Sequence, residues 1–143
     1  MKQVRNIIQS KGNIIFSVNP HTTVYEALEL MCEKNISSVL IMDGDKPLGI
    51  FTERDYARKV ALKGKASKET LISDVMTHNL ITVNPDCSIE EAMRIMTDKH
   101  IRHLPVTEGE KLTGLISIGD VVKYLIEEQK FIIGSLEQYI SHT

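Results

Sequence analysis

Apolar residues recur at helical spacing in two stretches of the chain. The first runs from Thr23 to about Asn35, and the second from Ser88 to about His100. Both open with Ser/Thr-x-x-Glu, the sequence of a capping box at a helix start. Their apolar positions are Val24, Ala27, Leu28 and Met31 in the first stretch and Ile89, Ala92, Met93 and Met96 in the second. This spacing predicts two amphipathic helices with Met31 and Met96 in the core.

Shorter apolar runs around these helices predict strands. Residues 14–18 and 80–83 precede the helices and end at Asn-Pro. After each helix, two runs flank a polar turn that contains Gly44 or Gly109, and glycine readily takes the positive φ of a hairpin turn. These strands are expected at residues 38–42 and 48–52, then at 103–107 and 112–117. A further helix should begin at Thr52 and at Ser117, so each half has the order β-α-β-β-α.

The two halves are an internal repeat. Residues 17–56 align with residues 82–121 without a gap, and most aligned positions keep their apolar or polar character. A gapless alignment predicts the same backbone twice, so a site in one half should have a counterpart in the other. We expect an α/β protein of two repeats related by a pseudo-twofold axis. A single half of this size is marginally stable, so the two should share a core.

The expected domains are residues 1–68 and 69–143, with a polar linker at 63–69. Residues 71–76 predict a short helical lead-in to the second repeat, and Val4, Ile7 and Ile8 are its counterpart at the start of the chain. After the second repeat a helical apolar stripe continues for about 24 residues, where Gly134 could interrupt it. This extended C-terminal helix exceeds what one half needs to cover. We expect it to pack on the N-terminal segment or on another subunit, and we favour the second, in a homodimer.

Composition excludes several classes of protein. The chain has 143 residues, 42% of them apolar and 25% charged, and no apolar run of membrane-spanning length. A net charge of −2 and the lack of Trp argue against nucleic acid as the main partner. Cys32 and Cys87 do not align between the repeats, so we expect free thiols in a reducing cytoplasm.

The sharpest shared motif lies where the last strand of each repeat meets the next helix. It is Gly49-x-x-Thr52-x-x-Asp55 in the first repeat, and the second repeat has the same form at Gly114, Ser117 and Asp120. One interpretation is simple helix capping. However, Asp is shorter than the Glu of the other two helix starts and less suited to reciprocal capping. An Asp at a helix start can instead accept ribose hydroxyls, beside Ser or Thr and free N–H groups that suit a phosphate. The two glycines would let a flat base approach the backbone.

These motifs, together with Asp74-Val-Met-Thr77 and Arg102-His-Leu-Pro-Val106, resemble a tandem cystathionine β-synthase (CBS) domain pair, also called a Bateman module. The resemblance covers essentially the whole chain. It implies two clefts between the halves that hold adenosine-containing ligands, among them AMP, ADP, ATP, S-adenosylmethionine or NAD. It also implies that the two Asp residues hold ribose hydroxyls and that Thr52 and Ser117 lie near phosphate.

The resemblance and the neighbouring charges together nominate the ligand-binding residues. These are Ser17, Thr52, Arg54, Asp55, Arg58, Thr82, Arg102, His103, Ser117, Asp120 and Lys123. The first motif contains Arg54 and is followed by Arg58, whereas in the second repeat only Lys123 matches Arg58. We therefore expect the first cleft to take the ligand with more phosphate, because the Arg fork clamps phosphate well. The alternative is that these cations form a solvated helix face.

The function expected is that of a non-catalytic sensor that binds an adenosine-containing ligand and regulates an unknown protein in the cytoplasm. A structural dimerisation module with vestigial sites is the alternative. An enzyme is disfavoured because the chain has no Walker loop, no G-x-G-x-x-G and no nucleophile elbow. His100 and His103 form H-x-x-H without a third suitable ligand, so no metal site is predicted.

Overall fold

The computed structural model describes residues 2–12 and 14–141, apart from the side chain of Ser141. The chain forms two compact units, and neither is continuous in sequence. The first-repeat unit consists of residues 14–81 and 107–112, and the second-repeat unit of residues 1–13, 82–106 and 113–143. Each unit takes the helix and strand elements of one repeat and adds a segment from elsewhere in the chain.

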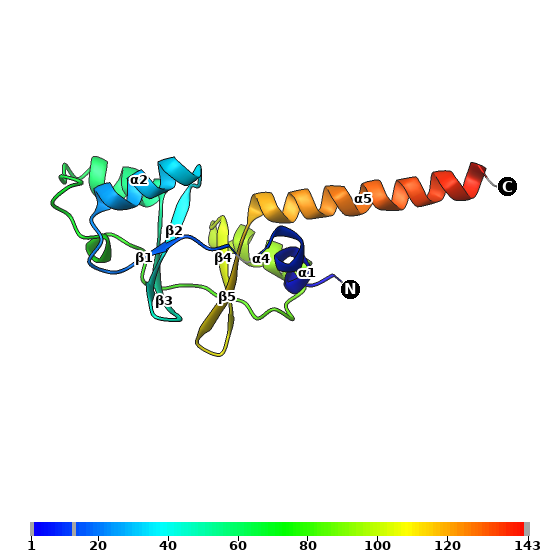
Figure 1. Ribbon diagram of the computed structural model, residues 1–143, viewed down its shortest axis with the longest axis horizontal. Coiled ribbons are helices and arrows are strands. Elements are labelled where there is room, and N and C mark those ends of the chain that lie inside the picture. The colour runs from blue at the N-terminus through cyan, green and yellow to red at the C-terminus, as the bar shows by residue number, and fades with distance from the viewer. Residues whose placement is uncertain (1, 13, 142–143) are drawn as a thin grey trace. The chain divides into compact units, whose positions relative to one another are not determined.

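The first-repeat unit has a three-stranded sheet in the order β1-β2-β3 (Figure 1). Strand β1 (Ser17–Val18) pairs parallel with β2 (Ser38–Asp43), which pairs antiparallel with β3 (Lys46–Thr52). Helix α2 (Val24–Lys34) connects β1 to β2. A short helix α3 (Glu53–Asp55) follows β3 and continues as a π-helical turn, Tyr56–Ala61, and Ile72–Asp74 form a 3₁₀ turn.

The apolar stripe of α2 packs on the sheet and on the lead-in segment. Val24, Ala27 and Met31 of the helix are buried with the strand residues Val39, Ile41 and Phe51. Ile72, Val75 and Met76 complete this cluster. The lead-in is therefore part of the core of the first-repeat unit.

The second-repeat unit repeats this design with one difference in its sheet. It contains α1 (Val4–Lys11), α4 (Ile89–Lys99) and α5 (Ile118–Ser141). It also contains most of the paired strands β4 (His103–Glu108) and β5 (Lys111–Ser117), whose connecting residues 107–112 belong to the first-repeat unit. Met96 is 1% exposed and Met31 4%, which confirms both as core residues. Gly44 and Gly109 have φ of 61° and 62°, as expected for the two hairpin turns.

The α/β fold and the long C-terminal helix are confirmed. Helices α2 and α4 begin and end at the expected caps, Thr23 and Asn35 in one case and Ser88 and His100 in the other. Gly134 does not interrupt α5, which is continuous over 24 residues. The interruption expected there is wrong, because a glycine inside a long helix lowers its stability by only about 1 kcal/mol relative to alanine.

The strand expected at residues 80–83 is also wrong: Val83 makes one isolated bridge, to Val106. In the first repeat, Ser17 pairs with Leu40 and Val18 with Ile41. The counterpart of Leu40 is Pro105, which has no N–H to donate to a neighbouring strand. Its carbonyl still accepts from the Val83 amide at 3.1 Å, so the ladder is reduced to a single bridge.

Each lead-in segment packs against the other repeat and not against the one that follows it in the chain. Residues 2–4 pair with the start of α4, where the Val4 amide donates to the Cys87 carbonyl and the Ile89 amide to the Lys2 carbonyl. Residues 70–72 make the same contacts at the start of α2, where the Ile72 amide donates to the Thr22 carbonyl and the Val24 amide to the Thr70 carbonyl. Thus α1 belongs with the second repeat and residues 70–77 with the first.

Candidate functional site

The first motif places a buried carboxylate at the start of α3. Asp55 is 8% exposed, and its Oδ2 accepts from the Thr52 amide at 3.0 Å and from the Thr52 hydroxyl at 3.1 Å. Oδ1 accepts from the Thr77 hydroxyl at 3.0 Å and lies 3.2 Å from Lys59 Nζ. Both oxygens of Asp55 are therefore engaged within the first-repeat unit.

The second motif has the same cap and a more open carboxylate. Oδ2 of Asp120 accepts from the Ser117 amide at 2.9 Å and from Lys11 Nζ at 2.7 Å. Lys11 Nζ also donates to the Leu115 carbonyl at 2.9 Å, which fixes the ammonium beside the strand end. The Asp120 side chain is 26% exposed. Among the residues that the structure describes, no hydrogen bond ends on its Oδ1.

The expectation that Asp is poorly suited to reciprocal capping is wrong. At both motifs the carboxylate accepts from the amide of the cap residue, while the Asp amide donates to the cap hydroxyl at 3.1 Å. At the start of α4, the Glu91 side chain does not complete a reciprocal capping box with Ser88; it pairs with Arg94 instead. A carboxylate three residues into a helix reaches the cap amide with either length of side chain. The change from Glu to Asp is therefore not by itself evidence for a ligand.

The two glycines of the motifs also have a different role from the one expected. A Cβ on Gly49 would lie 2.8 Å from the Thr77 carbonyl oxygen and 2.6 Å from Met76 Sδ. A Cβ on Gly114 would lie 2.4 Å from Cδ1 of Ile8. The prediction that they leave room for a base is wrong at this position, because the lead-in segments fill it. Glycine is needed there for close packing.

Charges around the second motif interact with one another. Burial raises the pKa of Asp120, but the hydrogen bonds from Lys11 and Ser117 and the charge of Lys11 outweigh it, so the pKa lies below its ordinary value. Burial also lowers the pKa of His103; Asp120 opposes this shift, and Lys11 and Arg102 add to it. Burial thus favours the neutral imidazole of His103, and the charge of Asp120 acts against it.

Most of the other predicted residues lie at exposed positions. Arg54, Arg58, Arg102 and Lys123 are exposed, as are Ser17 and Thr82 on the segments that enter the repeats. Arg102 contacts the start of α5 through its backbone, because its carbonyl accepts from the Ile118 amide at 3.0 Å. Lys59 contacts Asp55, and Lys11 contacts Asp120.

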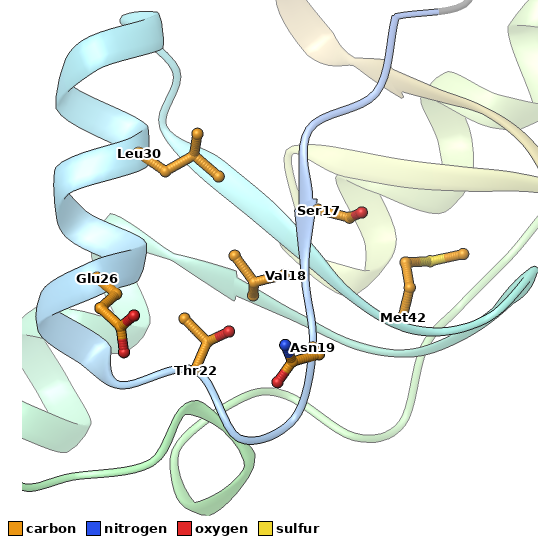
Figure 2. A pocket seen from close by; sticks show the side chains of 7 residues that line it. All are labelled: Ser17, Val18, Asn19, Thr22, Glu26, Leu30 and Met42. Carbon is orange, nitrogen blue, oxygen red and sulfur yellow. The ribbon is translucent and has the colours of Figure 1, made fainter.

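Ser17 lies on a pocket of about 480 Å³ beside β1 and α2 (Figure 2). Its lining also includes Val18, Asn19, Thr22, Glu26, Leu30 and Met42. Neither Thr52 nor Asp55 belongs to this lining. Of the predicted site residues, the pocket therefore contains Ser17 alone.

Sequence reasoning missed three side chains that contact the motif carboxylates. Lys59 follows Asp55 by four residues, and this helical i,i+4 spacing would have predicted the ion pair. Thr77 ends the Asp74-Val-Met-Thr77 motif, but its contact with Asp55 depends on the fold. Lys11 is 109 residues from Asp120 and had no signal in the sequence. In the described part of the chain, no cluster of three or more His, Cys, Asp or Glu residues could hold a metal ion.

Comparisons with known proteins agree with this architecture. The family model described as CBS domain matches residues 4–62 and 72–127. The mitochondrial CBS domain-containing protein CBSX3 of Arabidopsis thaliana is 41% identical over 123 residues, which are 82% of this chain and 60% of the relative. The chain thus spans less than two thirds of that protein's length.

Solved structures share the fold. A protein with CBS domains from Burkholderia ambifaria MC40-6 is 46% identical, with a TM-score of 0.85 over 90% of this chain and 96% of that one. The CBS domain pair of protein MJ0100 has a TM-score of 0.77 over 90% of this chain and 98% of that one, at 22% identity, which shows the fold alone. None of the helices described is long and apolar enough to cross a membrane.

The repeated α/β unit, the paired motifs and the match over both repeats lead to one conclusion: the chain belongs to the CBS domain family, as a tandem pair.

Proposed function

We propose that this protein binds an adenosine-containing ligand, such as AMP, ADP, ATP or NAD, and acts as a non-catalytic regulatory module. The observation that carries the proposal is the state of the Asp120 carboxylate. It is held by Ser117 and Lys11 through Oδ2, while Oδ1 remains available at a partly exposed position.

The hydrogen-bond capacity of a carboxylate supports this assignment. An ionised carboxylate has about four acceptor positions, two on each oxygen. At Asp120, two bonds on Oδ2 leave room for the two hydroxyls of a ribose on Oδ1. At Asp55, Thr52, Thr77 and Lys59 already occupy both oxygens. We therefore propose that Asp120 binds ribose first, and that binding at Asp55 requires Thr77 or Lys59 to move.

The phosphate of the ligand would lie near a helix start or a cation. Helix α5 is long and begins directly after Ser117, which suits an anion, whereas α3 has only three residues. The sequence favours a ligand with more phosphate at the first motif, which contains Arg54 and is followed by Arg58. Lys11 brings a cation to the second motif and makes the two motifs more alike in charge. The difference in phosphate preference stays a prediction.

Family membership supports the ligand class. The CBS domain pair of MJ0100 was solved in complex with 5′-methylthioadenosine and S-adenosyl-L-methionine, which are both adenosine derivatives. We extend this class to the present chain because Ser117 and Asp120 keep the residue types and spacing of the motif. A homodimer, a cytoplasmic location and an unidentified regulated protein complete the proposal.

Thermal shift and calorimetry with AMP, ADP, ATP, NAD and S-adenosylmethionine test the proposal. A bound ligand stabilises the folded state by about 2.7 kcal/mol at a hundredfold excess over Kd. Asp120→Asn should abolish or strongly weaken the response. Ser88→Ala is the matched control, because it weakens the helix cap of α4 and lies outside both motifs and the pocket that contains Ser17. Equal responses in both variants would contradict the assignment of Asp120.

A structural module with vestigial sites is the second candidate. It is favoured by one observation: both carboxylates already cap their own helices. In that case none of the adenosine compounds would shift the melting temperature at millimolar concentration, and Asp120→Asn would change stability alone. Product analysis after incubation with each nucleotide separates both candidates from an enzyme.

A further inference from the structure

Helix α5 carries a regular row of exposed apolar side chains, most of it beyond residue 127, where the second family match ends. Ile126, Ile133 and Ile140 recur every seven residues and are 49%, 54% and 68% exposed. Val122 and Leu136 occupy the alternate positions of the same seven-residue repeat, with Gln129 between them. In heptad terms the isoleucines are at position a and the others at position d.

The apolar face is wider than a row made of positions a and d alone. Ile132 and Tyr139, which precede two of the a positions, are 52% and 70% exposed. Apolar residues at three of seven positions are typical of a helix face that is covered by another helix. Together these side chains expose on the order of 700 Å², close to the roughly 800 Å² that each partner buries in a standard interface. A face of this size is rarely left open to water.

Helices α1 and α4 do not cover this face. They contact α5, but the apolar side chain that is buried there is Val121 (1% exposed), at the first turns of α5. Tyr124 and Glu128 lie on the α1 side, where Lys2 pairs with Glu128 at 3.0 Å. The exposed row begins at Val122 and continues to Ile140, close to the end of the described helix.

We propose that α5 pairs with α5 of a second copy of this chain, antiparallel, about a twofold axis near Lys130 and Ile132. In this register each a residue faces a d residue of the partner. Ile126 meets the partner's Leu136, Ile140 meets the partner's Val122, and Ile133 meets the partner's Gln129. Ile132 meets its own copy at the axis, as a twofold interface requires.

The charges on α5 favour the antiparallel direction. Lys123, Lys130 and Glu137 all occupy position e. In an antiparallel pair, e positions face each other, so Lys123 lies opposite the partner's Glu137, and the long Lys130 side chains at the axis can reach water. In a parallel pair, e faces g, so Lys130 and Glu137 would lie against Leu125 and Ile132. That arrangement would place charged groups on apolar side chains.

Molar mass in solution tests the pairing. The chain should associate through α5, and Ile133→Glu with Leu136→Glu should reduce the measured mass by a factor of two. Phe131→Glu is the matched control, because Phe131 is 74% exposed on the same helix but lies outside the row. Circular dichroism checks that each variant stays folded. A monomeric parent chain, or a mass that the double variant does not lower, overturns the proposal; neither outcome bears on ligand binding.

Charge exchange and spin-label distances test the direction. Lys123→Glu should weaken association at least threefold, and adding Glu137→Lys should restore it, because the opposite charges face each other again. Spin labels at position 123 or 130, with Cys32 and Cys87 replaced by Ser, give the geometry. At 1.5 Å per residue and with the axis at residue 131, the two 123 labels should lie about 24 Å apart along the helix axis and the two 130 labels only about 3 Å apart along it. Equal distances at both positions would show a parallel pair and overturn the antiparallel one.

Discussion

Lys11 Nζ lies 2.7 Å from Oδ2 of Asp120, although 109 residues separate them in the chain. The contact exists because the N-terminal lead-in packs with the second repeat. It joins the helix that begins the chain to the carboxylate that we propose as the ribose acceptor. A change at that carboxylate therefore acts directly on Lys11.

Removal of Lys11 should destabilise the protein modestly and in a pH-dependent way. Lys11→Met should cost about 0.5–1 kcal/mol at pH 7, the range of a partly exposed ion pair. The folded-state pKa of Asp120 is depressed, so its stabilisation is present above the unfolded-state pKa near 3.9 and is lost as pH falls through the folded-state value. Urea denaturation at pH 7 and pH 3 should show the difference shrinking in acid. Lys2→Met, which removes the pair with Glu128, should leave the Asp120 pKa unchanged.

His103 should titrate below its ordinary value. Burial disfavours the charged imidazole, and Lys11 and Arg102 add to this effect. Because the unfolded state binds the proton more readily, this group lowers stability as pH falls through the unfolded-state pKa of about 6.5. NMR titration of the His103 ring protons measures the pKa directly. Lys11→Met should raise it, and an unchanged value would contradict the proximity of the two groups.

The motif glycines should differ in their tolerance of alanine. Gly49→Ala should cost about 2–3 kcal/mol, because the new Cβ meets the Thr77 carbonyl, which is held by its pairing with Ile50. Gly114→Ala should cost less, since it meets the flexible end of Ile8, and Ile8→Val should relieve part of the cost. Gly134→Ala has open space and should stabilise α5 by about 1 kcal/mol. Chemical denaturation of the variants checks this order.

The two motif carboxylates should contribute unequally to stability. Asp55→Ala leaves the Thr52 amide, the Thr77 hydroxyl and Lys59 without their acceptor in a buried setting, which should cost about 2–3 kcal/mol. Asp120→Ala is more exposed and should cost about 1 kcal/mol. Equal losses in denaturation experiments would contradict the difference in burial. These values also set the baseline against which ligand-induced stabilisation is measured.

The sequence by itself determined the local elements. Periodicity, capping residues and turn glycines depend on neighbours within a few positions, so α2, α4, the hairpins and the length of α5 could be predicted. The repeat placed Thr52 with Asp55 and Ser117 with Asp120 in equivalent positions. Pro105, in contrast, has no N–H to donate, and the strand pairing between residues 80–83 and β4 is reduced to one bridge. This effect is visible only once the partner segment of β4 is known.

The tertiary structure decided how the motif residues are used. Contacts of Thr77 with Asp55, Lys11 with Asp120 and Ile8 with Gly114 join segments far apart in the chain, and no local pattern records them. These contacts explain why the two motif positions require glycine. They also explain why both oxygens of Asp55 are hydrogen-bonded or paired, whereas Oδ1 of Asp120 remains available. Side-chain hydrogen bonding depends on which groups the fold brings within about 3 Å, and that is decided only when the core has formed.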